Sequence, residues 1–241
     1  KKTGHLVIGE QPTTLIDLPG TYSFYPKRED EWVAYKVLMG VDEEVKTDVI
    51  LLIADASNLK RNLLFCSQII DLKIPVVLAL TMNDIAAKKG INIDIAGLQE
   101  DLGIPVVAVD ARKNKGLQEL KAVLNTIIQT PRAKNVESFI DNKALAPEAI
   151  LDFKKLYPTH SDYAALHYLM HHEAFPLEEE MQQTIVIAHN HRSAQDQRRT
   201  QTAKSQGVLR PSRLSALTLS GQHLAVGLHA IHQRVIPIQA F

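Results

Sequence analysis

The chain has 241 residues, of which 45% are hydrophobic and 22% are charged, and its 27 basic residues balance its 27 acidic ones. This is the composition of a folded globular protein, which excludes collagen-like, low-complexity and wholly disordered chains. The length allows one or two domains with a sizeable core. A single cysteine, Cys66, excludes an internal disulfide and a zinc cluster built from cysteines.

The sequence has no stretch of about eighteen uncharged apolar residues, which a membrane-spanning helix would need. The first residues, Lys1 and Lys2, lead into a short strand-like segment rather than the apolar segment of a signal peptide. We therefore expect these residues to be soluble and cytosolic.

The neutral net charge hides an uneven distribution. Residues 1–180 have a balance of −6, whereas residues 181–241 contain one acid, Asp196, against seven bases, with nine Gln and five His. Such asymmetry is typical of a basic tail, and it also arises where a shifted reading frame replaces the native sequence. We favour a frameshift or assembly error for this atypical tail; a genuine basic tail that contacts anionic lipid is the alternative.

Strand-like and helix-like segments alternate over the first 130 residues. Two short β-rich segments, 5–9 and 13–17, flank a turn and predict a hairpin. Further strands are predicted at 48–55, 74–80 and 104–109, and helices at 60–72, 94–102 and 117–128. Continuous apolar strands that alternate with helices indicate a doubly wound, mostly parallel α/β sheet.

Strand signals end after Thr130. Two helices are predicted at 147–157 and 161–174, and a small all-α domain is the simplest interpretation. We place the domains at 1–130 and 131–183, followed by the tail at 184–241.

Chemistry in doubly wound sheets is found at the carboxyl ends of the strands. The second predicted strand ends in Asp17-Leu18-Pro19-Gly20. An aspartate there can hold Mg²⁺ through water, and a glycine lets its amide approach a terminal phosphate. A plain turn explains these four residues equally well when they are taken alone. After the third strand, Asp55 is explained more simply as a helix N-cap.

The fourth predicted strand ends in Thr81-Met82-Asn83-Asp84, and the fifth ends in Asp110-Ala111-Arg112. A carboxylate at the fourth strand can accept two parallel hydrogen bonds from N1–H and the exocyclic amine of guanine, donors that adenine lacks. A backbone amide at the fifth can meet the carbonyl oxygen of the base. Each segment alone is explained as a cap or turn, but their succession at strand ends indicates a guanine-nucleotide site.

Seven stretches together carry a family resemblance. They are residues 2–4 (KTG), 17–23 (DLPGTYS), 29–34 (EDEWVA), 55–63 (DASNLKRNL), 75–84, 90–94 and 103–107. With these residues the chain resembles the cytoplasmic G-protein part of the bacterial ferrous iron transport protein B family. The resemblance covers residues 1 to about 130 and extends more loosely to about 180.

The resemblance implies a domain that binds GTP or GDP and hydrolyses GTP slowly, and a helical domain similar to a GDP-dissociation inhibitor. It implies Mg²⁺ at Asp17, held through water beside the γ-phosphate, with Gly20 supplying an amide to that phosphate. Residues 21 to about 33 would be the second switch, whose order depends on the γ-phosphate. Asp84 would recognise guanine, and Ala111 would mark the contact to the base carbonyl.

The family also implies a context for this part of the protein. Its partner would be the transporter's own membrane permease domain, with Fe²⁺ as the transported ion, at the cytoplasmic face of the bacterial inner membrane. No nucleic acid is implied, and a homo-oligomer is one assembly to consider. GTP hydrolysis would gate the permease.

The sequence departs from the family in ways that bear on activity. No P-loop, G-x-x-x-x-G-K-[ST], occurs in it, and the first-switch threonine and the central first strand, expected before Lys1, are also missing. Without a P-loop, no amides or lysine surround the α- and β-phosphates. We expect an N-terminally truncated GTPase that is inactive alone, with no catalytic residue of its own. The alternative is a degenerate G-domain fold that acts as a non-catalytic interaction module.

Two smaller departures concern the base site. Thr81 stands where G-proteins usually carry asparagine, which affects one base contact and one loop-bracing bond and leaves the choice of GTP over ATP open. Asp110 replaces the usual small hydroxyl residue before Ala111.

Two histidines, His167 and His171, are spaced i, i+4 on a predicted helix. This spacing can hold a transition metal. We favour the alternative, a solvated helix face.

Overall fold

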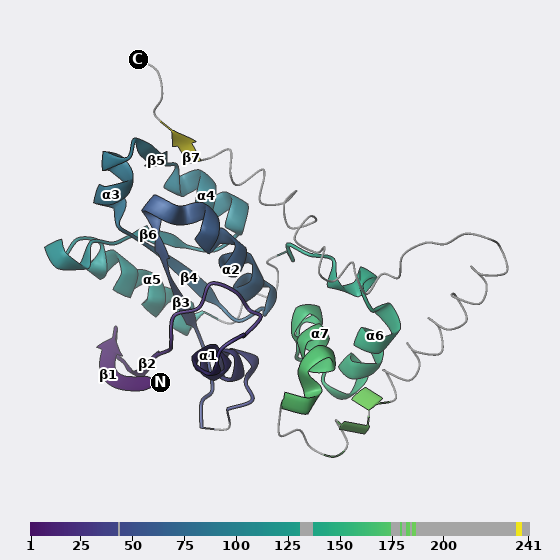
Figure 1. Cartoon of the computed structure of the whole chain (residues 1–241). Helices are drawn as coiled ribbons and strands as arrows, with labels where there is room; N and C mark the ends of the chain where they lie inside the picture. Colours follow the sequence, from purple (N-terminus) through teal and green to yellow (C-terminus); the bar gives the residue numbers. More distant parts are fainter. Residues whose placement is uncertain are drawn as a thin grey trace, which may run out of the picture. The chain divides into compact units, whose positions relative to one another are not determined.

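The computed structural model describes residues 1–42, 44–130, 137–174 and 235–237, with Glu179, Gln182, Gln183, Ile185 and Val186 (Figure 1). The chain divides into two compact units, Lys1–Phe139 with Val226–Phe241, and Ile140–Ala225. The elements of the first unit are β1 (Lys2–Ile8), β2 (Gln11–Asp17), α1 (Glu29–Met39), β3 (Ile50–Asp55), α2 (Leu59–Asp71), β4 (Val76–Thr81), α3 (Asn83–Lys88), β5 (Ile91–Ile93), α4 (Ile95–Leu102), β6 (Val106–Ala108), α5 (Leu117–Gln129) and β7 (Val235–Pro237). The second unit contains α6 (Pro147–Leu156) and α7 (Asp162–His171).

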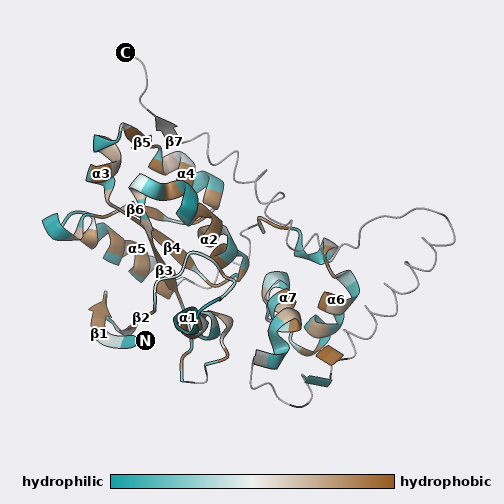
Figure 2. Cartoon of the chain, in the orientation of Figure 1, coloured by the Kyte–Doolittle hydropathy of each residue, from teal (hydrophilic) through white to brown (hydrophobic). Residues whose placement is uncertain are grey.

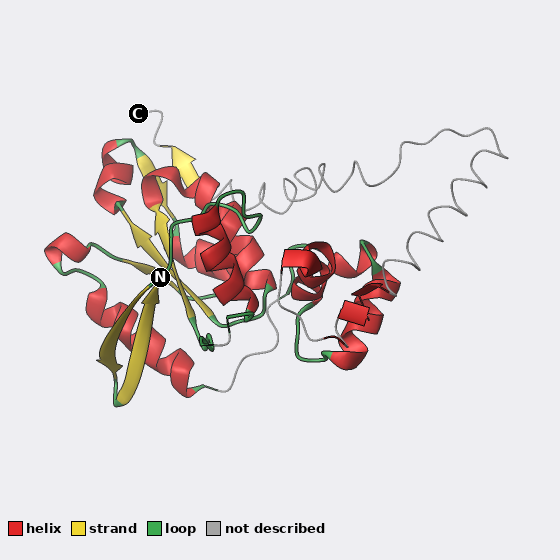
Figure 3. Cartoon of the chain, turned by 60° about the horizontal axis from the view of Figure 1, so that its bottom comes forward, coloured by secondary structure: helices red, strands yellow, loops and turns green. Residues whose placement is uncertain are grey.

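A parallel three-stranded sheet in the order β3-β4-β6 forms the centre of the first unit, with helices packed against it (Figure 3). Strands β3 and β4 are apolar up to their last residues, Asp55 and Thr81, as Figure 2 shows. All five residues from Val76 to Leu80 are buried, as expected for a strand with both faces covered. The prediction of an α/β fold with a parallel sheet is confirmed.

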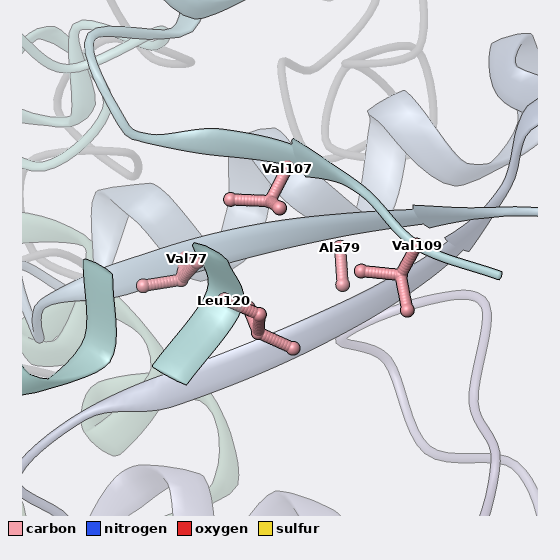
Figure 4. Close-up of a cluster of buried hydrophobic side chains, with 5 residues drawn as sticks. All are labelled: Val77, Ala79, Val107, Val109 and Leu120. Carbon is pink, nitrogen blue, oxygen red and sulfur yellow. The ribbon is translucent and has the colours of Figure 1, made fainter. Parts of the chain in front are cut away.

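Alternating residues of the sheet divide the core between its two faces. Val77 and Ala79 of β4 pack with Val107, Val109 and Leu120 on the face covered by α5 (Figure 4). Because successive side chains of a strand point to opposite faces, Leu78 and Leu80 lie on the other face, and both are fully buried. Packing on both faces holds the strands in place, and with them the loops that follow their carboxyl ends.

The predicted hairpin is present as β1 and β2. The strands pair antiparallel, with Lys2 opposite Asp17 and Ile8 opposite Gln11. In the part of the chain that the structure describes, the hairpin is a sheet of its own, without ladder hydrogen bonds to β3. Gly9 lies in its turn with φ +62°, directly against the Asn125 side chain of α5. The hairpin therefore contacts the unit through α5.

Strand β3 is an edge strand of the described sheet, paired on one side with β4. Ile53 at this edge is 55% exposed, although the next residue, Ala54, is 1% exposed. An apolar edge of this kind is unusual for the centre of an α/β domain, where parallel strands are covered.

Four helices and strands of the first unit were not predicted: α1, α3, β5 and β7. Helix α1 carries clear boundary signals, because Glu29, Asp30 and Glu31 lie in its first turn and Gly40 ends it at φ +72°. The predicted switch, residues 21 to about 33, thus consists of a loop followed by the first turn of α1. Strand β5 pairs antiparallel with β7.

Both predicted helices of the second unit are present. Pro147 is the first residue of α6, and the Ser161 hydroxyl caps α7 by accepting a hydrogen bond from the Ala164 amide. The predicted tail, 184–241, lies outside the described residues except for Ile185, Val186 and β7. Among the described residues, no helix combines the length and the apolar character needed to cross a membrane.

Candidate functional site

The carboxyl ends of the three parallel strands meet at one edge of the sheet. Asp55 lies opposite Thr81, and Leu80 lies opposite Ala108. The Val109 amide donates to the Leu80 carbonyl at 2.7 Å, which extends the pairing with β4 one residue beyond the end of β6. The segments 81–84 and 110–112 are therefore neighbours, as the sequence predicts.

The segment after β4 is held by its own polar side chains. The Thr81 hydroxyl donates to the Ala54 carbonyl at 3.1 Å, and the Asn83 amide group donates to the Leu80 carbonyl at 2.8 Å. Met82 takes the left-handed conformation, φ +58°, and its side chain is 45% exposed. Thr81 thus braces β4 against β3 in place of the expected asparagine.

Asp84 lies in the first turn of α3 and is exposed. Its carboxylate makes no hydrogen bond or ion pair with the residues that the structure describes, whereas Asn83 beside it is bonded to the backbone. The exposed Met82 offers an apolar surface next to this carboxylate. A planar base that donates two hydrogen bonds fits such a pair of groups.

The segment after β6 is a closed loop. Backbone hydrogen bonds of 3.0 Å run in both directions between Asp110 and Lys115, and Ala111 and Arg112 are exposed between them. The Asp110 carboxylate accepts from the Lys113 amide at 3.1 Å and lies 3.3 Å from the Lys113 ammonium. Burial acts to raise the pKa of Asp110, but these two interactions with Lys113 outweigh it and lower the pKa overall. Asp110 therefore organises the loop that presents Ala111 and Arg112.

Gly116 lies at the end of the same loop, at a position that only glycine can occupy without strain. Its φ is +76°, and an added Cβ would collide with the backbone carbonyl of Ala108. The loop can approach β6 this closely only because the side chain is absent.

The phosphate side of the candidate site follows β2. Asp17 and Gly20 are exposed, whereas Leu18 and Pro19 between them are half-buried. A Cβ added at Gly20 would meet nothing within 4 Å, so the space beside its amide is open. A single exposed carboxylate fits Mg²⁺, which prefers oxygen ligands and is commonly held by one or two carboxylates together with waters and substrate phosphates.

Side-chain contacts place the segment after Gly20 against α2. The Arg61 guanidinium lies 3.9 Å from the centre of the Tyr22 ring, a cation–π contact. Phe24 is 2% exposed, and its amide donates to the Gln68 side chain at 3.0 Å. The first contact brings Tyr22 to the start of α2, which follows the carboxyl end of β3, and the second fixes Phe24 to the second half of the helix.

The sequence interpretation missed Arg61, Gln68 and Asp71 of α2. Gln68 and Asp71 are buried polar residues inside an otherwise apolar helical segment. A polar pair at i, i+3 among apolar neighbours was the available signal, since buried polar groups require partners. Arg61 gave no signal that distinguishes it from other surface cations.

The preferred interpretation of His167 as part of a solvated helix face is wrong. His167 is fully buried in α7, where its ring lies 4.5 Å from Tyr163 and 5.8 Å from His171. Burial, with the nearby His171 as a smaller cause, lowers the pKa of His167 to about 3. Every residue from Tyr163 to Leu169 is buried, so this helix has no solvated face over that length. The described residues contain no group of three or more potential metal ligands.

The parallel sheet, with candidate ligand residues at its strand ends, defines the first unit as a doubly wound α/β domain. The chain belongs to the ferrous iron transport protein B family, whose family model matches residues 1–124. The family assignment made from the sequence is therefore confirmed.

The curated relatives are much longer than this chain. It is 38% identical over 125 residues to the Fe(2+) transporter FeoB of Leptospira biflexa, and 36% identical over 129 residues to that of Escherichia coli K12. Each match covers 52% of this chain but only 18% and 16% of the respective relative.

Solved structures of the same family share the fold. The cytosolic domain of the T. maritima FeoB iron transporter in its GMPPNP form matches with a TM-score of 0.70 and 24% identity, over 98% of this chain and 85% of that one. The cytosolic domain of L. pneumophila FeoB matches with a TM-score of 0.56 and 30% identity, over 69% of each chain. A GDP-bound mutant of the S. thermophilus FeoB G-domain matches with a TM-score of 0.63 and 25% identity, over 92% of this chain and 80% of that one.

Proposed function

We propose that this chain is the guanine-nucleotide-binding part of a ferrous iron transporter. GTP binding and hydrolysis in this part regulate the passage of Fe²⁺ through a membrane permease domain of the same protein. The part acts at the cytoplasmic face of the bacterial inner membrane. The family membership supports this role, as does the related G-domain bound to GDP.

The exposed Asp84 carboxylate at the end of β4 is the observation that carries the proposal. It follows the exposed Met82 by two residues, and β4 pairs with β6, the strand that leads to the exposed Ala111 and Arg112. Two parallel hydrogen bonds from guanine to this carboxylate select guanine over adenine. The Ala111 amide donates to the base carbonyl, which guanine has and adenine lacks.

The phosphate side uses Asp17 and Gly20. The Gly20 amide donates to the γ-phosphate, and the open space beside Gly20 allows that approach. Asp17 would hold Mg²⁺ through water, and the ion would supply positive charge to the phosphates of the nucleotide. When the γ-phosphate is lost, the segment from 21 to about 33 loses a contact and changes its order.

Tight binding requires residues outside the 241 of this chain, because its sequence contains no P-loop. A P-loop supplies the amides and the lysine for the α- and β-phosphates. We therefore propose that a longer form of the protein, with a P-loop before Lys1, binds GTP and GDP with Mg²⁺.

The test is a titration of the 241-residue chain and of the longer form with fluorescent GDP and ATP analogues, with and without Mg²⁺. In the longer form, Asp84→Ala should weaken GDP binding about a hundredfold or more, because two hydrogen bonds to a charged carboxylate are lost. Binding of the ATP analogue should not change. Asp48→Ala is the matched control, an exposed carboxylate that precedes β3 at the opposite end of the strand.

Guanine-selective binding by the longer form, and none by the 241 residues, is the expected result. If neither form binds nucleotide, the degenerate G-domain that serves as an interaction module becomes the better assignment. Equal loss of GDP and ATP binding in Asp84→Ala would contradict the role of Asp84 in base selection.

A further inference from the structure

The second half of α2 contains two buried polar side chains on one side of the helix. Gln68 is 4% exposed and Asp71 is 1% exposed. Residues three apart on a helix are neighbours on its surface. A buried amide and a buried carboxylate each need hydrogen-bond partners.

Both side chains bind backbone amides from distant parts of the sequence. The Gln68 side-chain oxygen accepts from the Phe24 amide at 3.0 Å, and an Asp71 carboxylate oxygen accepts from the Phe139 amide at 2.9 Å. Phe24 lies four residues after Gly20, in the segment that contacts the γ-phosphate in the proposed function. Phe139 immediately precedes Ile140, where the helical unit begins.

The helix between these contacts is firmly packed. Nine of the thirteen residues of α2 are buried, including every residue from Phe65 to Asp71. The Phe24 ring is also enclosed and lies 4.9 Å from the Tyr35 ring of α1. Close-packed interiors transmit strain, so a displacement of Phe24 against Gln68 would strain the turn of α2 whose Asp71 binds the Phe139 amide.

We propose that Gln68 and Asp71 are positioning residues that make α2 the coupling element between the segment after Gly20 and the connection into the helical unit. Reordering of the segment at Phe24 changes the strength of the hydrogen bond from the Phe139 amide to Asp71. Movement of Phe139 in turn changes the strength of the hydrogen bond from the Phe24 amide to Gln68. This inference rests on the proposed function, since a nucleotide is what reorders the segment. Coupling of this kind is reciprocal by thermodynamic necessity.

The test is amide hydrogen exchange on the 241-residue chain without nucleotide. Gln68→Ala should speed exchange of the Phe24 amide about tenfold, because its acceptor is removed, and that of the Phe139 amide about two- to threefold or more. Asp71→Ala should give the reverse order of effects. Gln68→Glu retains an acceptor and should restore slow exchange at Phe139.

The matched control is Gln99→Ala. Gln99 also accepts a hydrogen bond from a backbone amide, that of Val106 at 3.1 Å, but it lies on α4. It should speed exchange at Val106 and leave Phe24 and Phe139 unchanged. The amides of β4 report global stability in every variant, so that a general loss of folding is distinguished from a local one.

Effects confined to the amide next to each substitution would overturn the proposal, because Gln68 and Asp71 would then be independent anchors. Should Asp71→Ala not fold, Asp71→Asn and the Gln68 variants still decide the question. Coupling without nucleotide binding in the longer form would refute the proposed function alone. Guanine-selective binding with independent anchors would refute the coupling alone.

Discussion

The two sides of the candidate nucleotide site are built differently. On the base side, β4 and β6 belong to one parallel sheet. The loops after them are stabilised by hydrogen bonds between backbone groups and the side chains of Thr81, Asn83 and Asp110. On the phosphate side, Asp17 ends a hairpin that has no ladder hydrogen bonds to that sheet among the described residues, and Gly20 follows it. The hairpin and the segment after it contact the rest of the unit through α5 and α2.

This difference suits the two tasks of the proposed site, which are to select the base and to respond to the γ-phosphate. A ligand group that selects one base works best when it is fixed before the ligand arrives, because no ordering free energy is then spent. A segment that must change with the γ-phosphate needs anchors that can shift. In the proposed function, the braced loops after β4 and β6 meet the first requirement, and the segment after Gly20, which is anchored separately on α2, meets the second.

The base side should be the more sensitive to a single added methyl group. Gly116→Ala forces a left-handed alanine into contact with the Ala108 carbonyl. We expect a loss of about 3 kcal/mol in the free energy of unfolding, from the combined conformational and steric penalties. Chemical denaturation measures this loss. Gly4→Ala in β1 is the control, since nothing lies within 4 Å of its added Cβ; similar losses in both variants would contradict the explanation.

A second prediction concerns pH: the stability of the helical unit should depend on it more strongly than that of the sheet that carries the site. Burial, aided by the nearby His171, lowers the pKa of His167 from 6.5 to about 3 in the folded chain. Between these pH values the unfolded chain binds more protons, so the stability of the folded helical unit falls as the pH falls. In this range His167 lowers the free energy of unfolding by about 1.4 kcal/mol for each unit by which the pH falls. The lowered pKa values of His160 and His171 act in the same direction.

Thermal unfolding followed from pH 7 to pH 4.5 tests this dependence. His167→Gln should flatten the pH dependence of the transition that reports α6 and α7, whereas His5→Gln, at an exposed position of β1, should leave it unchanged. An unaltered slope in His167→Gln would show that another group is responsible. Amide exchange in β4 and β6 should change little over the same range.

The smallest effect is expected at the hairpin. Gly9→Ala places a left-handed alanine against the Asn125 side chain. We expect a loss of about 1–2 kcal/mol from the backbone conformation, with faster amide exchange in β1 and β2 and unchanged exchange in β4. Adding Asn125→Ala should relieve the steric part only. Complete recovery in the double variant would show that the conformation of Gly9 contributes nothing.

The sequence was sufficient to predict the parallel strands, their helices and the hairpin, because continuous apolar runs and turn residues depend on local chemistry. It also indicated that residues 81–84 and 110–112 share one edge, since parallel strands end together. Their position beside one another is now shown, whereas their binding of guanine stays a prediction.

Long-range contacts could not be predicted in the same way. The partners of Gln68 and Asp71 lie 44 and 68 residues away, so no local pattern identifies them. The burial of His167 depends on the packing around α7, which an i, i+4 spacing cannot reveal. Helix α1 is different, because its acidic first turn and Gly40 are local signals that predict a helix. It was not predicted because the family resemblance assigns the residues up to about 33 to the second switch.

The exposed edge of β3 has a consequence for handling the protein. A strand edge that pairs with no other strand in the described part of the chain, beside an apolar side chain such as Ile53, is a template for pairing with another extended chain. At high concentration we expect copies of the 241-residue chain to associate through this edge, because pairing supplies hydrogen bonds and buries Ile53. A charged residue in place of Ile53 opposes that self-association, because two such edges then repel one another.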